Sequence, residues 1–546
     1  MKNHTSIEPL EPRIAPATIS IVGKTATWTD FDGDLVTMKW TSTDAPFFAK
    51  MDRDLGLSVS RILLDPVKHN NASITVTVKA AGVFGDGRVE LGHLDGPGVA
   101  LKSFNGPKAG ISEIDLGNGV NSIGTLIMGS YGQTKIAFFS GAMGDELGEI
   151  NGSTKVVKIN GDITNGRLIV GGNSGTSTHG SISVAGNMRG DSDPNFGGEL
   201  YIFGHGKSLT VGGNLYSSAS ILTSAGIGVD KVTILGDIKA SNIYVSTSAL
   251  SIRGSVVDGV ITAISTKTIL IGGSLVAQSQ GGGTLTTFGN IGTITVKGSL
   301  IGTNAAKWDG FSIMGEADLS HAAAIVNKSS TSPASVKSIS IGGSIISGTI
   351  SNSNPAVNGG IYSEGNIGKL TIGGNIEGNS KTPVNILVKG TAPTTAGDYS
   401  AIGSITVKGS VTHAYIAAGT QLRGVVGDFM TGPQTYITPN PDAGIGSVKI
   451  GGDYIHSNIF AGVDDGGTFG VNNTAISDTL AVGDTARTAK IGAVAIKGHL
   501  LSDRDSGSLA GFAADVIPSI TVNGRKVFTA GDGLRNFDTF ITAREL

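Results

Sequence analysis

The sequence contains no cysteine among its 546 residues. This absence excludes disulfide bonds, thiol catalysis and thiolate metal sites. Aromatic residues make up only 5% of the chain and charged residues 15%, the latter well below the roughly 25% of an ordinary soluble domain. The 40 basic residues nearly balance the 43 acidic ones, for a net charge of −3. We therefore expect a surface rich in hydroxyl and amide groups and no nucleic-acid partner.

The absence of other sequence features argues against particular classes of function. No apolar stretch approaches the roughly 20 residues of a membrane-spanning helix, so we expect no membrane span. The first 17 residues lack the charged segment and apolar run of a secretory signal peptide. No His-Glu-x-x-His, nucleophile elbow or phosphate-binding loop occurs. The nine histidines are scattered, and we expect them at the surface or in turns.

A short phrase recurs along the chain and indicates its fold class. Its complete form is Ile-Gly-x-Ile-x-Val-x-Gly-Ser-Leu, and clear copies lie at 291–300, 402–411, 445–454 and 491–500. With its variants, most intervals from glycine to glycine are expected at roughly 16–27 residues, close to the period of a solenoid. The residues between copies lack the helical spacing that leucine-rich repeats require. The sequence therefore predicts an all-β fold, a right-handed parallel β-helix (β-solenoid) with a small N-terminal β module.

Within each copy, apolar and polar residues alternate. Ile294 and Val296 would point to one face of a strand, and Thr293 and Thr295 to the other. One face is therefore expected to be buried. The glycine that closes each strand is expected to take a positive φ and turn the chain sharply. These glycines are Gly298, Gly409, Gly452 and Gly498.

Four segments follow from this pattern. We expect a leader or export-type segment at 1–17, an N-terminal β module with an Asp-rich loop at 18–72, a β-solenoid of Gly-rich repeats at 73–529, and a C-terminal cap or assembly tail at 530–546. At about 4.8 Å for each rung of roughly 21 residues, the solenoid would be a rod on the order of 100 Å long. Weaker copies of the phrase, such as 426–428, are counted among its rungs.

The first segment carries the phrase Glu-Pro-Leu-Glu-Pro-Arg-Ile-Ala-Pro-Ala at 8–17. This phrase resembles the LEPR or LEAR-IAPA leader of exported β-strand-repeat proteins of the Planctomycetes–Verrucomicrobia group. Residues 26–37, which include Asp-Gly-Asp-Leu-Val-Thr, are similar to a segment that those proteins carry just after the leader. The resemblance implies export and an extracellular or cell-surface location, and it implies no known activity. The leader motif consists of Leu10, Glu11, Pro12 and Arg13.

Asp30, Asp32 and Asp34 form the most chemically specific motif, Asp-Phe-Asp-Gly-Asp. Three carboxylates at alternate positions around a glycine can converge on one hard cation, as in the first half of an EF-hand loop, so we predict a calcium site. The distal glutamate of such a loop is absent, since the twelfth position is Thr41. The alternative is an Asp-Gly hairpin turn that needs no metal. Both interpretations stay open.

Trp28 and Trp40 flank this turn in the sequence. The plain interpretation is a small core for the N-terminal module, because aromatic residues beside a hairpin usually pack locally. The functional interpretation is a platform for stacking sugars or for docking another subunit.

These features favour a non-enzymatic extracellular structural protein, a self-assembling rod that forms a surface-layer-like array or filament as a homo-oligomer. A surface adhesin that binds envelope glycans is the second candidate, and a polysaccharide lyase or hydrolase is the third. A glycan-cleaving site would need two or three carboxylates on successive rungs, about 5–10 Å apart, with an arginine or lysine nearby. The acidic pairs considered for it lie in Gly- or Pro-rich loops, where acidic turn residues are ordinary. They are Asp191 with Asp193 and Asp464 with Asp465.

Overall fold

The computed structural model contains strands and no helix among the residues that it describes. The all-β prediction is therefore confirmed. No helix of the described part has the length and hydropathy needed to cross a membrane. The described residues are 18–49, 57–81, 83–132, 147–172, 175–190, 197–224, 228–278, 282–302, 323–328, 334–348, 359–380, 382–391, 399–423, 435–464, 479–480, 488–501, 510–532, 534–538 and 541–545.

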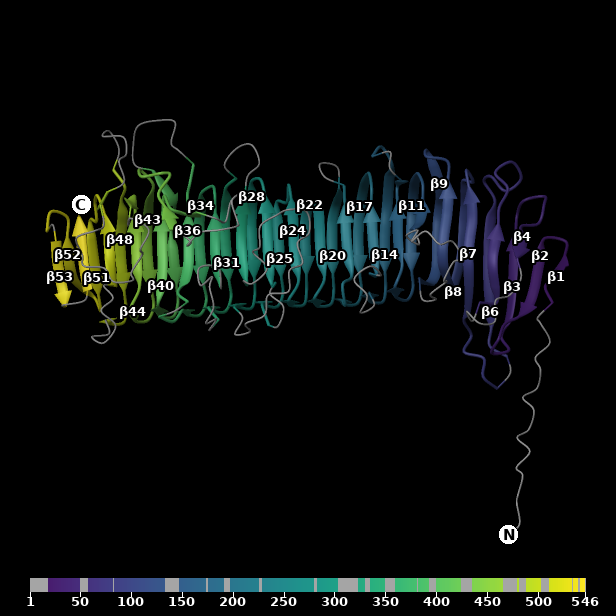
Figure 1. The fold of residues 1–546 in the computed structure, drawn as a ribbon, viewed down its shortest axis with the longest axis horizontal. Coiled ribbons are helices and arrows are strands. Elements are labelled where there is room, and N and C mark those ends of the chain that lie inside the picture. The colour runs from purple at the N-terminus through teal and green to yellow at the C-terminus, as the bar shows by residue number, and fades with distance from the viewer. Residues whose placement is uncertain are drawn as a thin grey trace, which may run out of the picture. The chain divides into compact units, whose positions relative to one another are not determined.

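The chain divides into two compact units, Met1–His205 and Gly206–Leu546 (Figure 1). The first unit begins with antiparallel strands and continues with parallel ones. In one series, antiparallel pairs join β1 (Ser20–Val22), β2 (Thr25–Thr29), β3 (Leu35–Trp40) and β6 (Ser73–Lys79). Parallel pairs then join β6 to β8 (Leu101–Gly117), β9 (Asn121–Tyr131), β11 (Ser153–Ile159) and β14 (Thr178–Val184).

A second series of the first unit starts at β4 (Phe47–Ala49), which pairs antiparallel with β5 (Val59–Leu63). Parallel pairs then join β5 to β7 (Val89–Pro97), β8, β10 (Leu147–Ile150), β13 (Arg167–Val170) and β16 (Glu199–Ile202). The short β12 (Ile163–Thr164) and β15 (Met188–Arg189) also pair in parallel. Each series therefore begins with antiparallel strands, which cover the edge of its first parallel strand.

Three parallel ladders make up most of the second unit, and we name them A, B and C. Ladder A joins β20 (Val229–Ile234), β22 (Asn242–Ile252), β25 (Thr268–Ile271), β28 (Ile291–Val296), β31 (Val336–Ile341), β34 (Ile367–Ile372), β38 (Ile405–Val407), β43 (Gly444–Ile450), β48 (Ile491–Ile496) and β51 (Ser519–Val522). Ladder B joins β18 (Leu215–Tyr216), β21 (Ile238–Lys239), β23 (Val256–Val257), β26 (Leu275–Val276), β29 (Leu300–Ile301), β32 (Ile345–Ile346), β35 (Ile376–Glu377), β39 (Val411–Thr412), β44 (Tyr454–Ile455) and β49 (Leu500–Leu501).

Ladder C joins β19 (Ser220–Thr223), β22, β24 (Val260–Ile264), β27 (Thr284–Phe288), β30 (Ala324–Lys328), β33 (Gly360–Ser363), β36 (Val384–Val388), β40 (Ala414–Ala418), β45 (Asn458–Ala461), β50 (Ala510–Ala514) and β54 (Ile541–Glu545). The chain visits the ladders in the order A, B, C and then returns to A. Each strand therefore pairs with its equivalent from the preceding turn of the chain. The remaining strands are β17 (His205–Val211), β37 (Ser400–Ile402), β41 (Gln421–Arg423), β42 (Thr435–Ile437), β46 (Val463–Asp464), β47 (Thr479–Leu480), β52 (Arg525–Thr529) and β53 (Leu534–Asp538).

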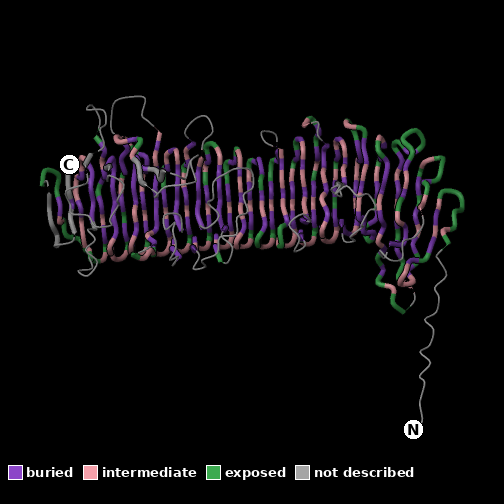
Figure 2. Tube along the Cα trace, in the orientation of Figure 1, coloured by how far each residue is buried: buried purple, intermediate pink, exposed green. Residues whose placement is uncertain are grey.

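The predicted alternation holds in ladder A. Ile294 and Val296 are fully buried, whereas Thr293 is exposed. Ile294 lies opposite Ile269 on one side and Ile339 on the other, so apolar residues stack on one another from turn to turn. Figure 2 shows the resulting alternation of buried and partly exposed positions along the strands. Each such aliphatic side chain contributes about 1.5–3 kcal/mol when fully buried.

A row of side-chain acceptors follows each strand of ladder A. The backbone N–H of Ser299 donates to Ser274 Oγ at 3.0 Å, and that of Ser344 donates to Ser299 Oγ at 3.0 Å. The same hydrogen bond links equivalent residues of successive turns without a break through the second unit. We call this row the acceptor ladder, and it consists of the acceptors Asn214, Asp237, Ser255, Ser274, Ser299, Ser344, Asn375, Ser410 and Asp453 and ends at His499, whose backbone N–H is the last donor.

The prediction that the repeat glycines take a positive φ is wrong. Gly298, Gly409, Gly452 and Gly498 do not have a positive φ. A Cβ atom on each would instead lie 1.9–2.4 Å from the acceptor oxygen of the preceding turn, the shortest distance being from Gly409 to Asn375 Oδ1. Glycine is therefore required by the close approach of neighbouring turns. The repeat keeps glycine and the polar residue after it together, because the polar side chain of one turn fills the space that glycine leaves in the next.

The predicted spacing of the rungs is also wrong beyond Ser299. Successive residues of the acceptor ladder are 18–25 residues apart from Asn214 to Ser299, but they are 31–46 residues apart from Ser299 to His499. Because Asp453 accepts from His499 and donates to Ser410 directly, no other residue of this ladder lies between them. The weaker copies at 426–428 and 482–484 lie outside the described residues. Long insertions therefore separate the rungs there.

Ladder C departs from simple alternation, because all five residues of β36 are buried. Apolar side chains from neighbouring strands of this ladder form a buried cluster in addition to the alternating core. Its members are Ala324, Val326, Tyr362, Leu387, Ala417, Phe460, Val463 and Ala513, with Tyr415 packed against them. At the C-terminal end, β52 pairs antiparallel with β51 and β53 pairs antiparallel with β54.

Candidate functional site

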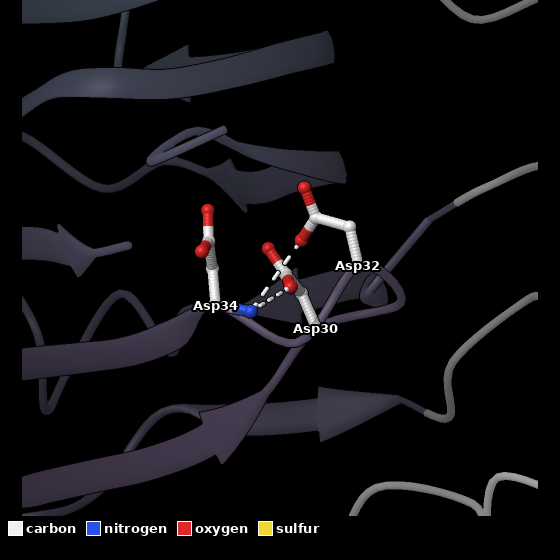
Figure 3. A group of neighbouring side chains, drawn as sticks. All are labelled: Asp30, Asp32 and Asp34. Atoms are coloured by element: carbon white, nitrogen blue, oxygen red, sulfur yellow. Dashed lines mark hydrogen bonds between the residues drawn. The ribbon is translucent and has the colours of Figure 1, made fainter. Parts of the chain in front are cut away.

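Asp30, Asp32 and Asp34 lie in the turn between β2 and β3, which pair as an antiparallel hairpin. The predicted hairpin is therefore confirmed. One carboxylate oxygen from each aspartate lies within 4.8 Å of the other two, and Figure 3 shows the three side chains gathered at the turn. Carboxylate oxygens are ligands that Ca²⁺ prefers. The arrangement fits a cation, and the bound ion stays a prediction.

Asp34 joins this turn to the segment that follows β6. Its side chain is fully buried. One oxygen accepts a hydrogen bond from the backbone N–H of Ala81 at 2.9 Å, and the other accepts one from Gly87 at 2.5 Å. A Cβ atom on Gly85 would lie 1.9 Å from Asp34 Oδ1, so this glycine is needed to let the carboxylate in. Asp34 is thus a structural acceptor whether or not a cation is bound.

Asp30 and Asp32 are coupled through a shared hydrogen bond. Burial, followed by the hydrogen bond to the Asp32 side chain, raises the pKa of Asp30 to about 7. The same hydrogen bond is the main cause that lowers the pKa of Asp32. Near pH 7 the Asp30 carboxyl group is therefore only partly ionised, and in its protonated form it donates to Asp32. The proton and a divalent cation compete for these oxygens, because each relieves the repulsion between the carboxylates.

Two tryptophans pack beneath this turn. Trp28 is 2% exposed and Trp40 is 4% exposed, and both contact Phe48, with ring centroids 6.2 and 6.4 Å away. Trp28 Nε1 donates to Ser58 Oγ at 3.2 Å. The core interpretation is therefore confirmed, and neither ring is available as a sugar platform.

Several residues singled out from the sequence lie outside the described part of the chain. They are the leader residues Leu10, Glu11, Pro12 and Arg13 and the acidic residues Asp191, Asp193 and Asp465. The backbone of Asp464 belongs to β46, but its side chain is outside the described set. The leader resemblance stays a prediction.

His179 contradicts the expectation that the histidines lie at the surface or in turns, because it is only 4% exposed and lies within β14. His69 is also buried, at 3% exposed, but it lies in a turn. His413 and His456 are turn residues with φ of 46° and 45°, and their rings stack with centroids 4.8 Å apart. Register between β39 and β44 brings this pair together, and no sequence motif could have indicated it.

The main group missed by sequence reasoning is a row of three carboxylates in the first unit. Asp95 on β7 lies opposite Asp115 on β8, which lies opposite Glu149 on β10. We call these three residues the carboxylate ladder. Neighbouring parallel strands are about 4.8 Å apart, which sets the spacing of its members. The sequence carried a weak signal, since His-Leu-Asp at 93–95 and Glu-Ile-Asp at 113–115 are similar strand-end patterns.

A second row lies beside the carboxylate ladder on β5, β7 and β8, two residues before Asp95 and Asp115 on the last two of these strands. Arg61, His93 and Glu113 are in register there. Arg61 forms an ion pair with Asp95. His93 Nδ1 lies 3.8 Å from Glu113 Oε2. The two rows thus place four carboxylates next to one guanidinium.

Burial and mutual repulsion perturb these groups. Burial, and then the charge of Asp95, raise the pKa of Asp115. Burial, and then the charge of Asp115, raise the pKa of Glu149. Burial is also the main cause that lowers the pKa of His93, so this imidazole is neutral near pH 7. The carboxylates of the ladder therefore disfavour each other's ionisation, and Arg61 is ion-paired with Asp95.

Glu90 on β7 is a separate perturbed group. Burial raises its pKa to about 7, although the Ser130 hydroxyl donates a hydrogen bond to Glu90 Oε1 at 3.4 Å. A Cβ atom on Gly110 would lie 2.1 Å from Glu90 Oε2, so the carboxyl group packs directly over this glycine. The folded chain therefore favours the protonated form.

Replacing Glu90 with glutamine is expected to stabilise the chain by about 3 kcal/mol at pH 8 and by less than about 1 kcal/mol at pH 5. A carboxyl group whose pKa is raised by folding keeps its proton in the folded state longer than in the unfolded state. The wild-type chain therefore loses stability as pH rises from the unfolded value through about 7, and glutamine removes this loss. Urea unfolding at both pH values measures the effect. Glu377→Gln, an exposed substitution, is the control, and an equal gain at both pH values would contradict the assignment.

Comparison of the chain with models of known protein families, with curated proteins and with solved structures finds no match. The Asp-rich turn and the carboxylate ladder are therefore interpreted from their own contacts. The turn gathers three carboxylates, and through Asp34 it is also hydrogen-bonded to the segment that follows β6. The carboxylate ladder offers excess negative charge on regularly spaced strands.

Proposed function

We propose that the chain is a right-handed parallel β-solenoid with a small N-terminal β module, and that it is a non-enzymatic structural protein of the cell exterior. Copies of the chain assemble into a surface-layer-like array or filament. The return of the chain to the same three ladders supports the solenoid. The right-handed sense is supported by the general preference of parallel β crossovers.

The acceptor ladder is the observation that carries the structural role. It ties each turn of the second unit to the next by the same hydrogen bond, from Asn214 to His499. Solenoid stability is approximately the sum of such neighbour contacts, so the ladder stiffens the whole unit without needing disulfides. Repetition of one turn also presents a regular surface, which suits a lattice or fibre subunit.

The N-terminal edge supports self-assembly. Strand β1 has an uncharged sequence, Ser-Ile-Val, and its residues are exposed, with Ile21 at 48% and Val22 at 76%. Among the described strands, its partner is β2. An exposed edge without charge is a template for pairing with another chain, and proteins that remain monomeric usually protect such edges.

Calcium binding at Asp30, Asp32 and Asp34 is part of this proposal. It is supported by the convergence of the three carboxylates, whose mutual repulsion a divalent cation would relieve. The location outside the cell is supported by the resemblance of the N-terminal phrase to the leaders of exported repeat proteins. Calcium would fix the hairpin next to the β1 edge and so favour assembly through it.

Negative-stain electron microscopy of the full-length chain, with calcium and then with a chelator, tests this proposal. We expect ordered sheets or filaments with calcium that dissolve on chelation. Asp32→Asn is expected to prevent calcium-dependent assembly while leaving the fold intact, and Asp230→Asn, an exposed substitution in the second unit, is the matched control. Dispersed single particles of wild-type chain in both conditions would overturn self-assembly.

A surface adhesin that binds envelope glycans is the second candidate function. The carboxylate ladder favours it, because stacked carboxylates on rigid strands can hold a repeating ligand. The same ladder meets the requirement of stacked carboxylates beside an arginine that a glycan-cleaving site would have, so binding and cleavage need to be separated by experiment.

A further inference from the structure

The edge strands at the N-terminal end of the first unit carry no charge. Strand β1 is Ser-Ile-Val with all three residues exposed, and its partner among the described strands is β2. Strand β4 is Phe-Phe-Ala, its partner there is β5, and Phe47 is 63% exposed. The charged residue that follows β1, Lys24, lies in the turn to β2 and donates to the carbonyl oxygen of Thr41 at 2.9 Å. Neither strand therefore has a charge of its own that would oppose pairing with a second chain.

The backbone of β1 can accept another strand. Hydrogen-bonded and non-hydrogen-bonded residues alternate along an antiparallel pair, and Ile21 lies opposite Ala26 in the pair of β1 with β2. Part of the β1 backbone therefore directs its N–H and C=O groups away from β2. A strand added at this edge would bond to those groups and would cover Ile21 and Val22, which are 48% and 76% exposed. Covering these apolar side chains favours the association.

The edge strands at the C-terminal end of the second unit carry charge. Strand β52 begins with Arg525 and Lys526, both exposed, and its partner among the described strands is β51. The sequence of β53 contains Arg535 and Asp538. Two β52 edges would bring like charges together. Pairing β52 with β1 would take its two cations out of water beside a strand that has no acidic residue. The β1 edge is therefore better matched by an uncharged edge than by β52.

We propose that β1 pairs with β1 of a second copy, antiparallel and about a twofold axis, so that two chains join through their N-terminal ends. Full overlap of these three-residue strands places Ile21 opposite the partner's Ile21. A twofold contact uses the same surface on both copies, which suits an edge that is apolar and uncharged. The inference rests on the self-assembly proposed above and names the surface that the partner copy presents. Because a twofold contact is closed, growth of an array uses another contact in addition.

Exchanging charges at this position tests the proposal by analytical ultracentrifugation of the full-length chain with calcium at several protein concentrations. Ile21→Lys and Ile21→Glu are each expected to weaken pairing at least tenfold, because each brings two like charges together. Mixing the two variants in equal amounts is expected to restore pairing, since lysine then lies opposite glutamate. Val120→Lys, at a 69% exposed position elsewhere in the first unit, is the matched control and is expected to pair as the wild type does.

An introduced cysteine provides a second measurement that does not depend on charge. The chain has no cysteine, so Ile21→Cys has a single thiol. Residues directly opposite each other in an antiparallel pair have Cα atoms about 4.5–5.5 Å apart, a distance that a disulfide can span. We expect Ile21→Cys to form a covalent dimer on mild oxidation and Val120→Cys to form none. Thermal unfolding checks that each variant is folded, and if a charged variant is not, the cysteine variant decides the outcome.

Three results would overturn the proposal, and they separate it from self-assembly as such. Stronger assembly of Ile21→Glu alone, with cross-linking of Ile21→Cys to Lys526→Cys and not to itself, would show that β1 pairs with β52 of the next copy. Assemblies that tolerate both charged variants, without a covalent Ile21→Cys dimer, would place the contact elsewhere and leave self-assembly standing. Wild-type chain that stays monomeric at every concentration, again without a covalent dimer, would overturn both proposals.

Discussion

Alanine at Gly409 is expected to destabilise the second unit by about 3–5 kcal/mol. The new Cβ atom would lie 1.9 Å from Asn375 Oδ1 and 2.8 Å from the carbonyl oxygen of Gly374. The amide side chain can escape only by giving up its hydrogen bond from the backbone N–H of Ser410, 2.9 Å long in the wild type. Backbone of the preceding turn blocks the other direction, so strain and a lost hydrogen bond add together.

Gly524→Ala is the matched control, because this glycine has a φ of +75° and nothing within 4 Å of an added Cβ atom. It is expected to cost only the strain of a left-handed residue, about 1–2 kcal/mol. Guanidinium unfolding of both variants provides the comparison. Asn375→Ala combined with Gly409→Ala is expected to recover part of the lost stability, since the clashing atom is gone. If both glycine variants lose the same stability, close approach is not the reason for the repeat glycines.

This contrast also shows where the sequence stopped being informative about the fold. Alternation in 291–296 was enough to predict a strand with one buried face, because a strand's periodicity is local. The role of Gly409 depends on the distance to Asn375, which belongs to the preceding turn. A single sequence shows that Gly and Ser, Asn or Asp recur together, but the contact that links them exists only after the turns have stacked.

The two candidate sites also differ in how far the sequence could predict them. Asp30, Asp32 and Asp34 are neighbours in sequence, so their convergence could be predicted from spacing alone. Asp115 and Glu149 belong to different strands, and they meet because β8 and β10 pair in one particular register. Shifting that register by one residue would move a carboxylate to the buried face. Sequence periodicity fixes which face a residue occupies, but not which residue lies next to it on another strand.

Alanine at Asp34 is expected to destabilise the N-terminal strands by about 2–5 kcal/mol, with or without calcium. The substitution leaves the backbone N–H groups of Ala81 and Gly87 without their acceptor in a buried position. Hydrogen exchange at these two amides is expected to accelerate together with exchange in β2 and β3. Asp34→Asn keeps one acceptor oxygen and is expected to lose about half as much stability.

Asp32→Ala separates the metal site from the turn. Asp32 is only partly buried, and its side chain accepts from Asp34 N at 3.4 Å and from Asp86 N at 3.2 Å, contacts that water can replace. We expect it to abolish the stabilisation by calcium while lowering stability without calcium by at most about 1 kcal/mol. Thermal unfolding of the two alanine variants with calcium and with chelator measures both effects. Equal losses in the two variants without calcium would show that Asp34 has no special structural role. A full response to calcium in Asp32→Ala would exclude this aspartate as a ligand and overturn the proposed site of three carboxylates at this turn.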